Sequence, residues 1–214
     1  VKGFLRLFLE IWCYNERLWD YSLLEDCSPV SAKGTVIPYG DNPLDDENLA
    51  RQVYLDIINR AKQYVYIMTP YLILDAETEN ALKYASKRGV DVRIIVPSVP
   101  DHKYAYTLML EHLPSLISSG VRVYSYLPGF IHAKVLISDG NIATVGTVNF
   151  DYRSLYLHFE CGCVMYDSHC INDIKEDFIA SFKKCHLLEK ADLKKRGILS
   201  RISGKLLKAI APLM

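Results

Sequence analysis

The turn Ser138-Asp139-Gly140-Asn141 separates two short apolar runs, and this pattern constrains the fold most strongly because it predicts a β-hairpin. Polar residues flank the hairpin on both sides: His132 and Lys134 precede the first run, and Thr147 and Asn149 follow the second. Side chains two residues apart on a strand point to the same face. An imidazole, an ammonium, a hydroxyl and an amide are therefore expected to converge, and this set suits a phosphate.

These residue types fit phosphodiester chemistry. Lys134 supplies a positive charge, while Thr147 and Asn149 supply neutral donors to the non-bridging oxygens. The imidazole of His132 can attack phosphorus or protonate the departing alkoxide, but one ring cannot do both in the same step. A pair of histidines can divide the two roles. Glu160 is expected to accept the Nδ1 proton of His132, which leaves Nε2 facing the phosphate.

The spacing of these residues resembles the signature of the phospholipase D superfamily, H-x-K-x4-D-x6-G-[ST]-x-N. The matching residues are His132, Lys134, Asp139, Gly146, Thr147 and Asn149. Glu160 lies where members of the superfamily place the carboxylate that orients the histidine. The resemblance implies that Lys134, Thr147 and Asn149 bind the phosphate, and that Asp139, although part of the catalytic motif, has a supporting role.

Longer stretches resemble the second half of bacterial cardiolipin synthases within that superfamily. They are residues 129–134, 149–154, 159–160, 69–71 and 88–97, and residues 4–12 resemble the segment that follows the first motif. The resemblance implies a phosphatidyltransferase that joins two phosphatidylglycerol molecules into cardiolipin and glycerol through a phosphohistidine, without a metal or other cofactor. The histidine of the first motif is then the nucleophile, and His132 is the general acid that protonates the leaving glycerol.

The motif occurs once, because none of the other five histidines begins an H-x-K, and the chain begins with Val1. We therefore expect a C-terminal half whose partner is a missing N-terminal half that carries the first motif. Two alternatives stay open. A single-motif phosphodiesterase or nuclease completes its site as a homodimer, whereas an isolated half-domain is inactive without its partner motif.

Helical and strand patterns alternate along the chain, which predicts an α/β fold with a mixed β-sheet flanked by helices, as in phospholipase D-like domains. A loop with several Pro and Gly breakers is expected over residues 21–46. The expected helices are 2–16, 48–62, 77–87, 104–118 and 171–185, and the expected strands outside the hairpin are 64–68, 91–96, 121–126 and 157–165. Residues 1–186 form the predicted catalytic half-domain, and residues 187–214 form a basic amphipathic tail.

Charge separates this tail from the rest of the chain. The whole chain has a formal net charge of zero, which disfavours nucleic acid as a partner. The tail carries seven Lys or Arg against Glu189 and Asp192, and its apolar residues recur at helical spacing: Leu199, Ile202, Leu206, Ile210 and Leu213. Such a helix either lies in an anionic membrane surface or packs its apolar stripe on the domain. The lipid substrate favours the membrane, and the expected location is the cytoplasmic side of a bacterial cell membrane.

Several residues outside the motif leave alternatives open. His158, Cys161, Cys163, His169 and Cys170 are crowded enough for zinc to be imagined, but they lack a C-x2-C pair, so reduced thiols and no metal are predicted. Tyr71 suits core packing or substrate contact equally. The segment 101–103 is expected to be an exposed loop, and Asp151 and Arg153 are expected to form an ion pair that holds the motif loop.

Overall fold

The structure is a computed structural model that describes residues 2–17, 22, 32–194 and 197–211. Its strands are β1 Thr35–Asp41, β2 Tyr64–Met68, β3 Asp91–Pro97, β4 Arg122–Tyr126, β5 Val135–Ser138, β6 Ile142–Gly146, β7 Glu160–Tyr166 and β8 Cys185–Leu187. Its helices are α1 Lys2–Glu16, α2 Leu49–Arg60, α3 Ala76–Lys87, α4 Lys103–Ser118, α5 Tyr152–Tyr156, α6 Cys170–Phe182, α7 Lys190–Lys194 and α8 Ile198–Ile210.

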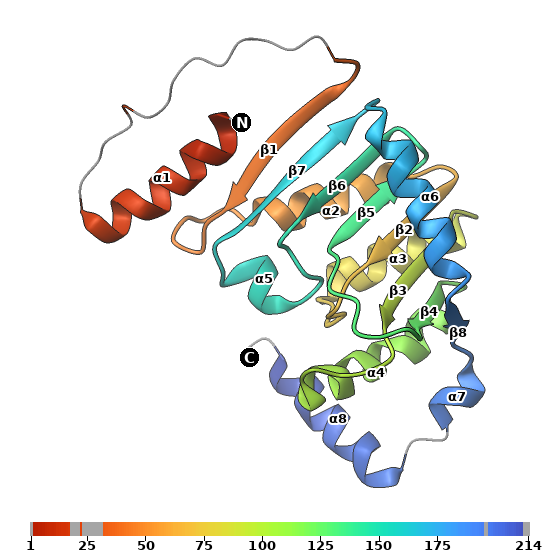
Figure 1. The fold of residues 1–214 in the computed structure, drawn as a ribbon. Coiled ribbons are helices and arrows are strands. Elements are labelled where there is room, and N and C mark those ends of the chain that lie inside the picture. Colours follow the sequence, from red (N-terminus) through yellow and green to blue (C-terminus); the bar gives the residue numbers. More distant parts are fainter. Residues whose placement is uncertain (1, 18–21, 23–31, 195–196, 212–214) are drawn as a thin grey trace.

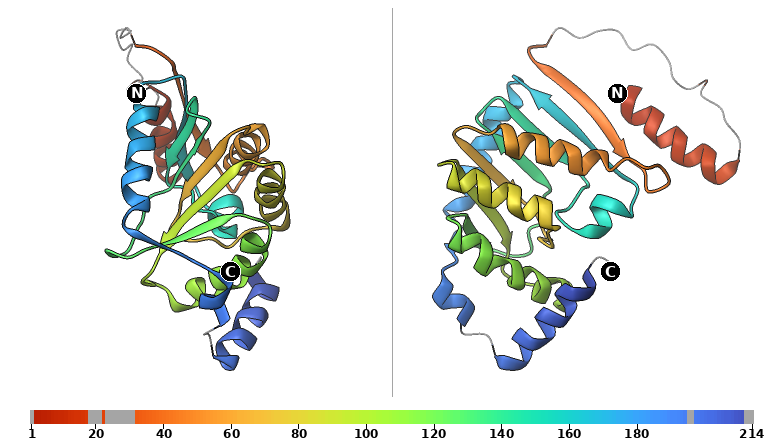
Figure 2. Two further views of the ribbon diagram at one scale, coloured as in Figure 1. Left: turned by 90° about the vertical axis from the view of Figure 1, so that its right-hand side faces the viewer. Right: turned by 180° about the vertical axis from the view of Figure 1, so that it is seen from behind.

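The strands form one eight-stranded mixed sheet in the order β1-β7-β6-β5-β2-β3-β4-β8 (Figure 1). β2, β3 and β4 are parallel, whereas the hairpin strand β5 pairs antiparallel with β2. Helices α2, α3 and α4 cover one face and α6 covers the other (Figure 2). The predicted fold class, a mixed sheet flanked by helices, is confirmed.

The core has two layers because both faces of the sheet are covered. All five residues of β2 are buried, which explains its uninterrupted apolar and aromatic composition. Ile58 of α2 and Leu82 of α3 pack against one face, and Phe178 of α6 packs against the other. Burying a large apolar side chain contributes about 1.5–3 kcal/mol. These two layers therefore hold the central strands in place and fix the positions of the loops that leave them.

The expected helices and strands correspond to α1, α2, α3, α4, α6, β2, β3 and β4 within a few residues, and the predicted hairpin is β5–β6. The expected loop over residues 21–46 is wrong at its end, because residues 35–41 form β1. Pro38 and Gly40 suggested a loop, but β1 is an edge strand paired only with β7, where a proline is tolerated. Tyr39 and Asp41 point inward from it and are buried. The breaker Pro29 lies outside the described residues.

Three short elements, α5, β8 and α7, were not expected. The predicted strand 157–165 begins only at Glu160, because α5 and its last turn occupy the residues before it. β8 crosses the predicted boundary between residues 186 and 187 and pairs with β4. Helix α7 follows it. Elements of three to five residues have too little periodicity to be recognised in a sequence.

The C-terminal helix α8 packs on α4 (Figure 1). The contact is close at Gly204, where a Cβ would lie 2.5 Å from Oε1 of Glu111. Leu207 and Ala211 complete the packed side. Of the predicted tail, Lys195, Arg196, Pro212 and Leu213 lie outside the described residues, as do the side chains of Leu199 and Arg201. No helix in the described part of the chain has the length and apolarity that a membrane span requires.

A partly buried ionic cluster fixes α8 to the domain. Nδ1 of His112 lies 2.9 Å from Oε2 of Glu79, and Nζ of Lys208 lies 3.5 Å from the same oxygen. The hydrogen bond from His112 is the main cause that lowers the pKa of Glu79 to about 2. The rotation of α8 about its own axis is therefore set by a specific contact as well as by apolar packing.

Replacing Glu79 with glutamine should lower the free energy of unfolding at pH 7 by about 2 kcal/mol, since Lys208 loses its counter-charge and His112 loses a charged hydrogen-bond partner. The ionised carboxylate stabilises the fold above its ordinary pKa of 4.5, and this contribution is lost as the pH falls from 4.5 toward about 2. The free energy of unfolding, measured with urea across this pH range, should fall less steeply with decreasing pH in Glu79→Gln than in the parent. Equal pH slopes would contradict the assignment.

Candidate active site

All the predicted site residues except Asp139 gather at one edge of the sheet. This edge holds the carboxyl ends of β2, β3 and β6 and the amino ends of β5 and β7. His132 and Lys134 lie just before β5, Thr147 and Asn149 just after β6, and Glu160 begins β7. The antiparallel β5–β6 hairpin therefore brings the two halves of the motif to the same edge, as the spacing predicted.

His132 and Lys134 contact each other directly. Nζ of Lys134 lies 3.1 Å from Nδ1 and 3.0 Å from Nε2 of His132, and 2.9 Å from the backbone oxygen of His132. The imidazole is exposed, and the lysine is half-buried. Burial lowers the pKa of Lys134 and outweighs the opposite effect of the nearby carboxylates of Glu160, Asp151 and Asp101. The ammonium supplies a positive charge for an anionic phosphodiester, and the accessible imidazole beside it can attack phosphorus or transfer a proton.

Thr147 and Glu160 form a second contact across β6 and β7. The hydroxyl of Thr147 donates to Oε2 of Glu160 and accepts a 3.0 Å hydrogen bond from the backbone N–H of Cys161. Gly146 permits this approach, because a Cβ there would lie 2.3 Å from the backbone oxygen of Cys161. The glycine of the motif thus has a steric role: it lets the strands come close enough for the threonine and the glutamate to meet.

Glu160 does not have the partner that the sequence predicted. Its Oε1 lies 3.8 Å from Nδ1 of His158, whose Nε2 accepts a 3.2 Å hydrogen bond from Nε of Arg153. Among the described residues, the His132 ring contacts Lys134 and the ring of Phe130, not Glu160. The physical reason is that Glu160 begins β7, beside the segment that carries Thr147 and His158. The expected Asp151–Arg153 ion pair is likewise replaced by the Arg153–His158 hydrogen bond.

The loop that carries Asn149 is held from several sides. The hydroxyl of the buried Tyr54 donates to the backbone oxygen of Val148 at 2.7 Å, and its ring stacks on Phe150. Asp151 caps α5 by accepting a 2.8 Å hydrogen bond from the backbone N–H of Ser154. Nδ2 of Asn149 lies 2.9 Å from the hydroxyl of the same serine. Burial raises the pKa of Asp151.

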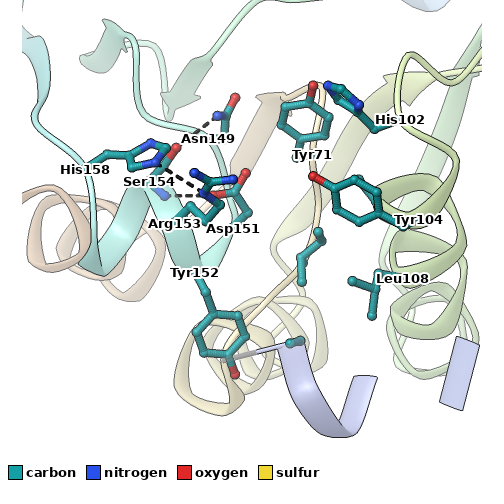
Figure 3. A pocket seen from close by; sticks show the side chains of 13 residues that line it. Tyr71, His102, Tyr104, Leu108, Asn149, Asp151, Tyr152, Arg153, Ser154 and His158 are labelled. Atoms are coloured by element: carbon teal, nitrogen blue, oxygen red, sulfur yellow. Dashed lines mark hydrogen bonds between the residues drawn. The ribbon is translucent and has the colours of Figure 1, made fainter. Parts of the chain in front are cut away.

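A cavity of about 220 Å³ opens beside this loop (Figure 3). Its polar wall comes from Asn149, from Arg153 and Ser154 of α5, and from His158 after α5. Its other wall comes from Tyr71, His102 and Tyr104. Leu108 and Ala211 make its floor apolar. Tyr71 donates to the carboxylate of Asp101, and both burial and this bond raise the pKa of Tyr71. The segment 101–103 is thus exposed, as predicted, and also borders the cavity.

Asp139 lies at the opposite edge of the sheet from the other motif residues. Its carboxylate accepts hydrogen bonds of 2.8, 2.9 and 2.9 Å from the backbone N–H groups of Lys62, Gln63 and Tyr64, at the start of β2. Its φ of 52° is in the left-handed region, which aspartate tolerates better than most residues. Asp139, which the motif groups with the catalytic residues, thus lies away from them, and its contacts fit the supporting role that the resemblance implies.

Replacing Asp139 with alanine should destabilise the chain by about 2 kcal/mol, because three backbone donors lose a charged acceptor and the left-handed backbone becomes strained. For a chain of this size the melting temperature should fall by about 4–8 °C. Asp139→Asn retains an acceptor oxygen and tolerates the same φ, so it should lose less than half as much. A calorimetric scan of both variants tests this, and an unchanged melting temperature for the alanine variant would contradict it.

Five described cysteines, Cys13, Cys161, Cys163, Cys170 and Cys185, are free thiols. Within the described residues, no three His, Cys, Asp or Glu side chains converge in a group that a metal ion would need. Cys27 lies outside the described residues.

Residues 54–184 match the family described as cardiolipin synthase, PLD-like domain. The chain is 45% identical over 216 residues to an uncharacterized protein of Streptococcus mutans, with all of this chain and 47% of that protein covered. It is 34% identical over 217 residues to cardiolipin synthase 1 of Bacillus cereus, with 97% of this chain and 43% of that protein covered. The chain spans less than half the length of these two relatives.

The fold is also similar to that of Nuc, a phospholipase D family member from Salmonella typhimurium, with a TM-score of 0.62 and 22% identity. That crystal structure covers 74% of this chain, and all of Nuc is covered. The mixed sheet, the motif residues gathered at one of its edges and the family match together define a phospholipase D-like domain. The chain belongs to the cardiolipin synthase family of these domains.

Proposed function

We propose that this chain supplies one half of the active site of a phosphatidyltransferase that joins two phosphatidylglycerol molecules into cardiolipin and glycerol. The observation that carries the proposal is the contact between the exposed imidazole of His132 and the ammonium of Lys134 at the sheet edge that also holds Thr147, Asn149 and Glu160. The similarity to cardiolipin synthases supports a phospholipid as the substrate.

In the proposed reaction, a histidine nitrogen of the other half attacks the phosphorus of the first lipid. A P–N bond forms, and the bond from phosphorus to the oxygen of the headgroup glycerol breaks. His132 gives its proton to that oxygen. A hydroxyl of the second lipid then attacks the phosphohistidine, loses its proton to His132 and releases the first histidine. Lys134, Thr147 and Asn149 hold the non-bridging oxygens, with no metal or other cofactor in either step.

Exposed apolar residues at the same edge support a partner half with the first motif. Phe130, Leu157 and Phe159 are exposed there. Phe159 also lines a groove of about 550 Å³ between α1 and Glu160. Exposed apolar surface beside a catalytic edge is typical of a region that another folded unit covers. A second copy of this chain is the alternative partner, and one His132 would then have to act as the nucleophile.

The test combines light scattering, which gives the mass in solution, with ³¹P detection of phosphohistidine after mixing with phosphatidylglycerol. We expect a monomer that traps no phosphohistidine alone but forms cardiolipin once a segment with the first motif is restored. A dimer that traps phosphohistidine, and loses it in His132→Ala, would establish the homodimer instead. Cleavage of DNA by such a dimer, without turnover of phosphatidylglycerol, would overturn the proposed function in favour of a nuclease.

A further inference from the structure

The side of α8 that faces away from α4 is apolar and exposed. Ile202, Leu206 and Ile210 are 54%, 66% and 48% exposed, and their four-residue spacing places them on one face of the helix. These three residues are called the α8 stripe below. It is not the packed side, since Gly204, Leu207 and Ala211 make the contacts with the domain. One side of α8 therefore packs on the domain, and the three described residues of the apolar stripe that the sequence predicts do not.

The charge around the α8 stripe is positive. Lys205 is exposed next to Leu206. Residues 187–214 together carry a net charge of +5, although Lys208 is engaged with Glu79. An apolar stripe beside an exposed lysine, on a segment of net positive charge, matches the interface of a bilayer with anionic lipids, where the apolar groups enter the acyl boundary and the cations stay with the headgroups.

The α8 stripe is also adjacent to the candidate active site. Ala211, directly after the last residue of the stripe, lines the cavity beside Asn149. Leu207 packs in the same apolar cluster as Ile73 and Tyr152 (Figure 3 shows Tyr152 on the wall of the cavity). The C-terminal end of the stripe therefore lies one residue from the apolar floor of the cavity.

Helix α1 exposes apolar residues too, including Phe8 and Trp12, but its surroundings differ in charge. The groove beside it is lined by the acidic residues Glu10, Asp41 and Glu160. Such a surface repels anionic headgroups and is better suited to a protein partner. The two exposed apolar helices are thus distinguished by charge, and only α8 complements an anionic bilayer.

We propose that the α8 stripe docks the domain on a bilayer that contains anionic phospholipid. The proposal does not depend on the chemistry at His132, because it concerns the binding of a surface and not turnover. It assigns α8 the role of an interfacial helix whose orientation is fixed by its packed side and by the Lys208–Glu79 ion pair.

The test is co-sedimentation of the 214-residue chain with vesicles of phosphatidylcholine, with and without about one third phosphatidylglycerol. The parent should partition preferentially onto the anionic vesicles. The double variant Ile202→Ser/Leu206→Ser should lower that partition coefficient by at least about tenfold, because two apolar side chains no longer enter the bilayer. Both positions are exposed, so the melting temperature should not change.

Three matched variants complete the design. Ile179→Ser removes an apolar side chain that is 44% exposed from α6, on the other face of the sheet, and should bind as the parent does. His132→Ala should also bind, so that failed catalysis is distinguished from failed docking. Loss of binding in Phe8→Ser but not in the α8 variant would overturn the proposal, as would equal binding by the α8 variant and the parent. A change in solution mass of the α8 variant, with unchanged vesicle binding, would identify a protein contact and overturn it too.

Discussion

Replacing His132 with alanine should lower cardiolipin formation from phosphatidylglycerol by about 10³-fold or more, once the chain is assembled with the half that completes its site. The imidazole is exposed at the sheet edge that holds the motif residues, where it can transfer a proton to the leaving oxygen. Nζ of Lys134 contacts both of its ring nitrogens. Because His132 is exposed, its loss should leave the melting temperature within a few degrees of that of the parent. The measurement is the rate of glycerol release.

The leaving group distinguishes the two roles of His132. A general acid is dispensable when the leaving group needs no proton, so a p-nitrophenyl phosphodiester should reduce the defect of His132→Ala to about tenfold or less. A nucleophile would be needed with either substrate. His169→Ala is the matched control, since His169 is an exposed histidine after the far end of β7, and it should retain the parent rate. Near-parental glycerol release by His132→Ala would contradict the catalytic assignment.

Much of the site was predictable because its determinants are local in the sequence. The hairpin turn at residues 138–141 fixes which residues of β5 and β6 face each other, so His132 and Thr147 must end at the same sheet edge. The same reasoning placed Asp139 in the turn, at the other end of β5. Its contacts with the backbone at Gln63 and Tyr64 join segments about 75 residues apart, and no local pattern indicates them.

The other differences also arise from contacts between distant segments. β1 was missed because the local signals of Pro38 and Gly40 outweigh a pairing with β7 that becomes favourable only in the folded sheet. Whether Glu160 lies next to His132 or next to His158 depends on side-chain positions that the spacing of the motif does not determine. The cavity wall of Tyr71 and Tyr104 comes from the segment after β2 and the first turn of α4, and of these two residues the sequence indicates only Tyr71 as a candidate ligand contact.

Replacing Lys134 with methionine should lower kcat/KM by about 10²–10³-fold, because the site loses the charge that neutralises the phosphodiester. Arginine retains a positive charge, but its planar guanidinium does not fit where Nζ lies within about 3 Å of both ring nitrogens and the backbone oxygen of His132. Lys134→Arg should therefore restore only part of the activity. Lys62→Met, which removes an exposed lysine at the opposite edge, should be neutral.

The pH profile gives a second test of Lys134. Burial lowers its pKa below the ordinary value of 10.5, so the ammonium is lost at a lower pH than in an exposed lysine. The required species is the protonated one, and kcat/KM should therefore decline on the alkaline side before that ordinary value is reached. In Lys134→Arg this decline should move to higher pH, because the guanidinium stays protonated throughout. An alkaline limb at the same pH in both proteins would show that another group controls it, and would remove Lys134 from the role of phosphate-binding cation.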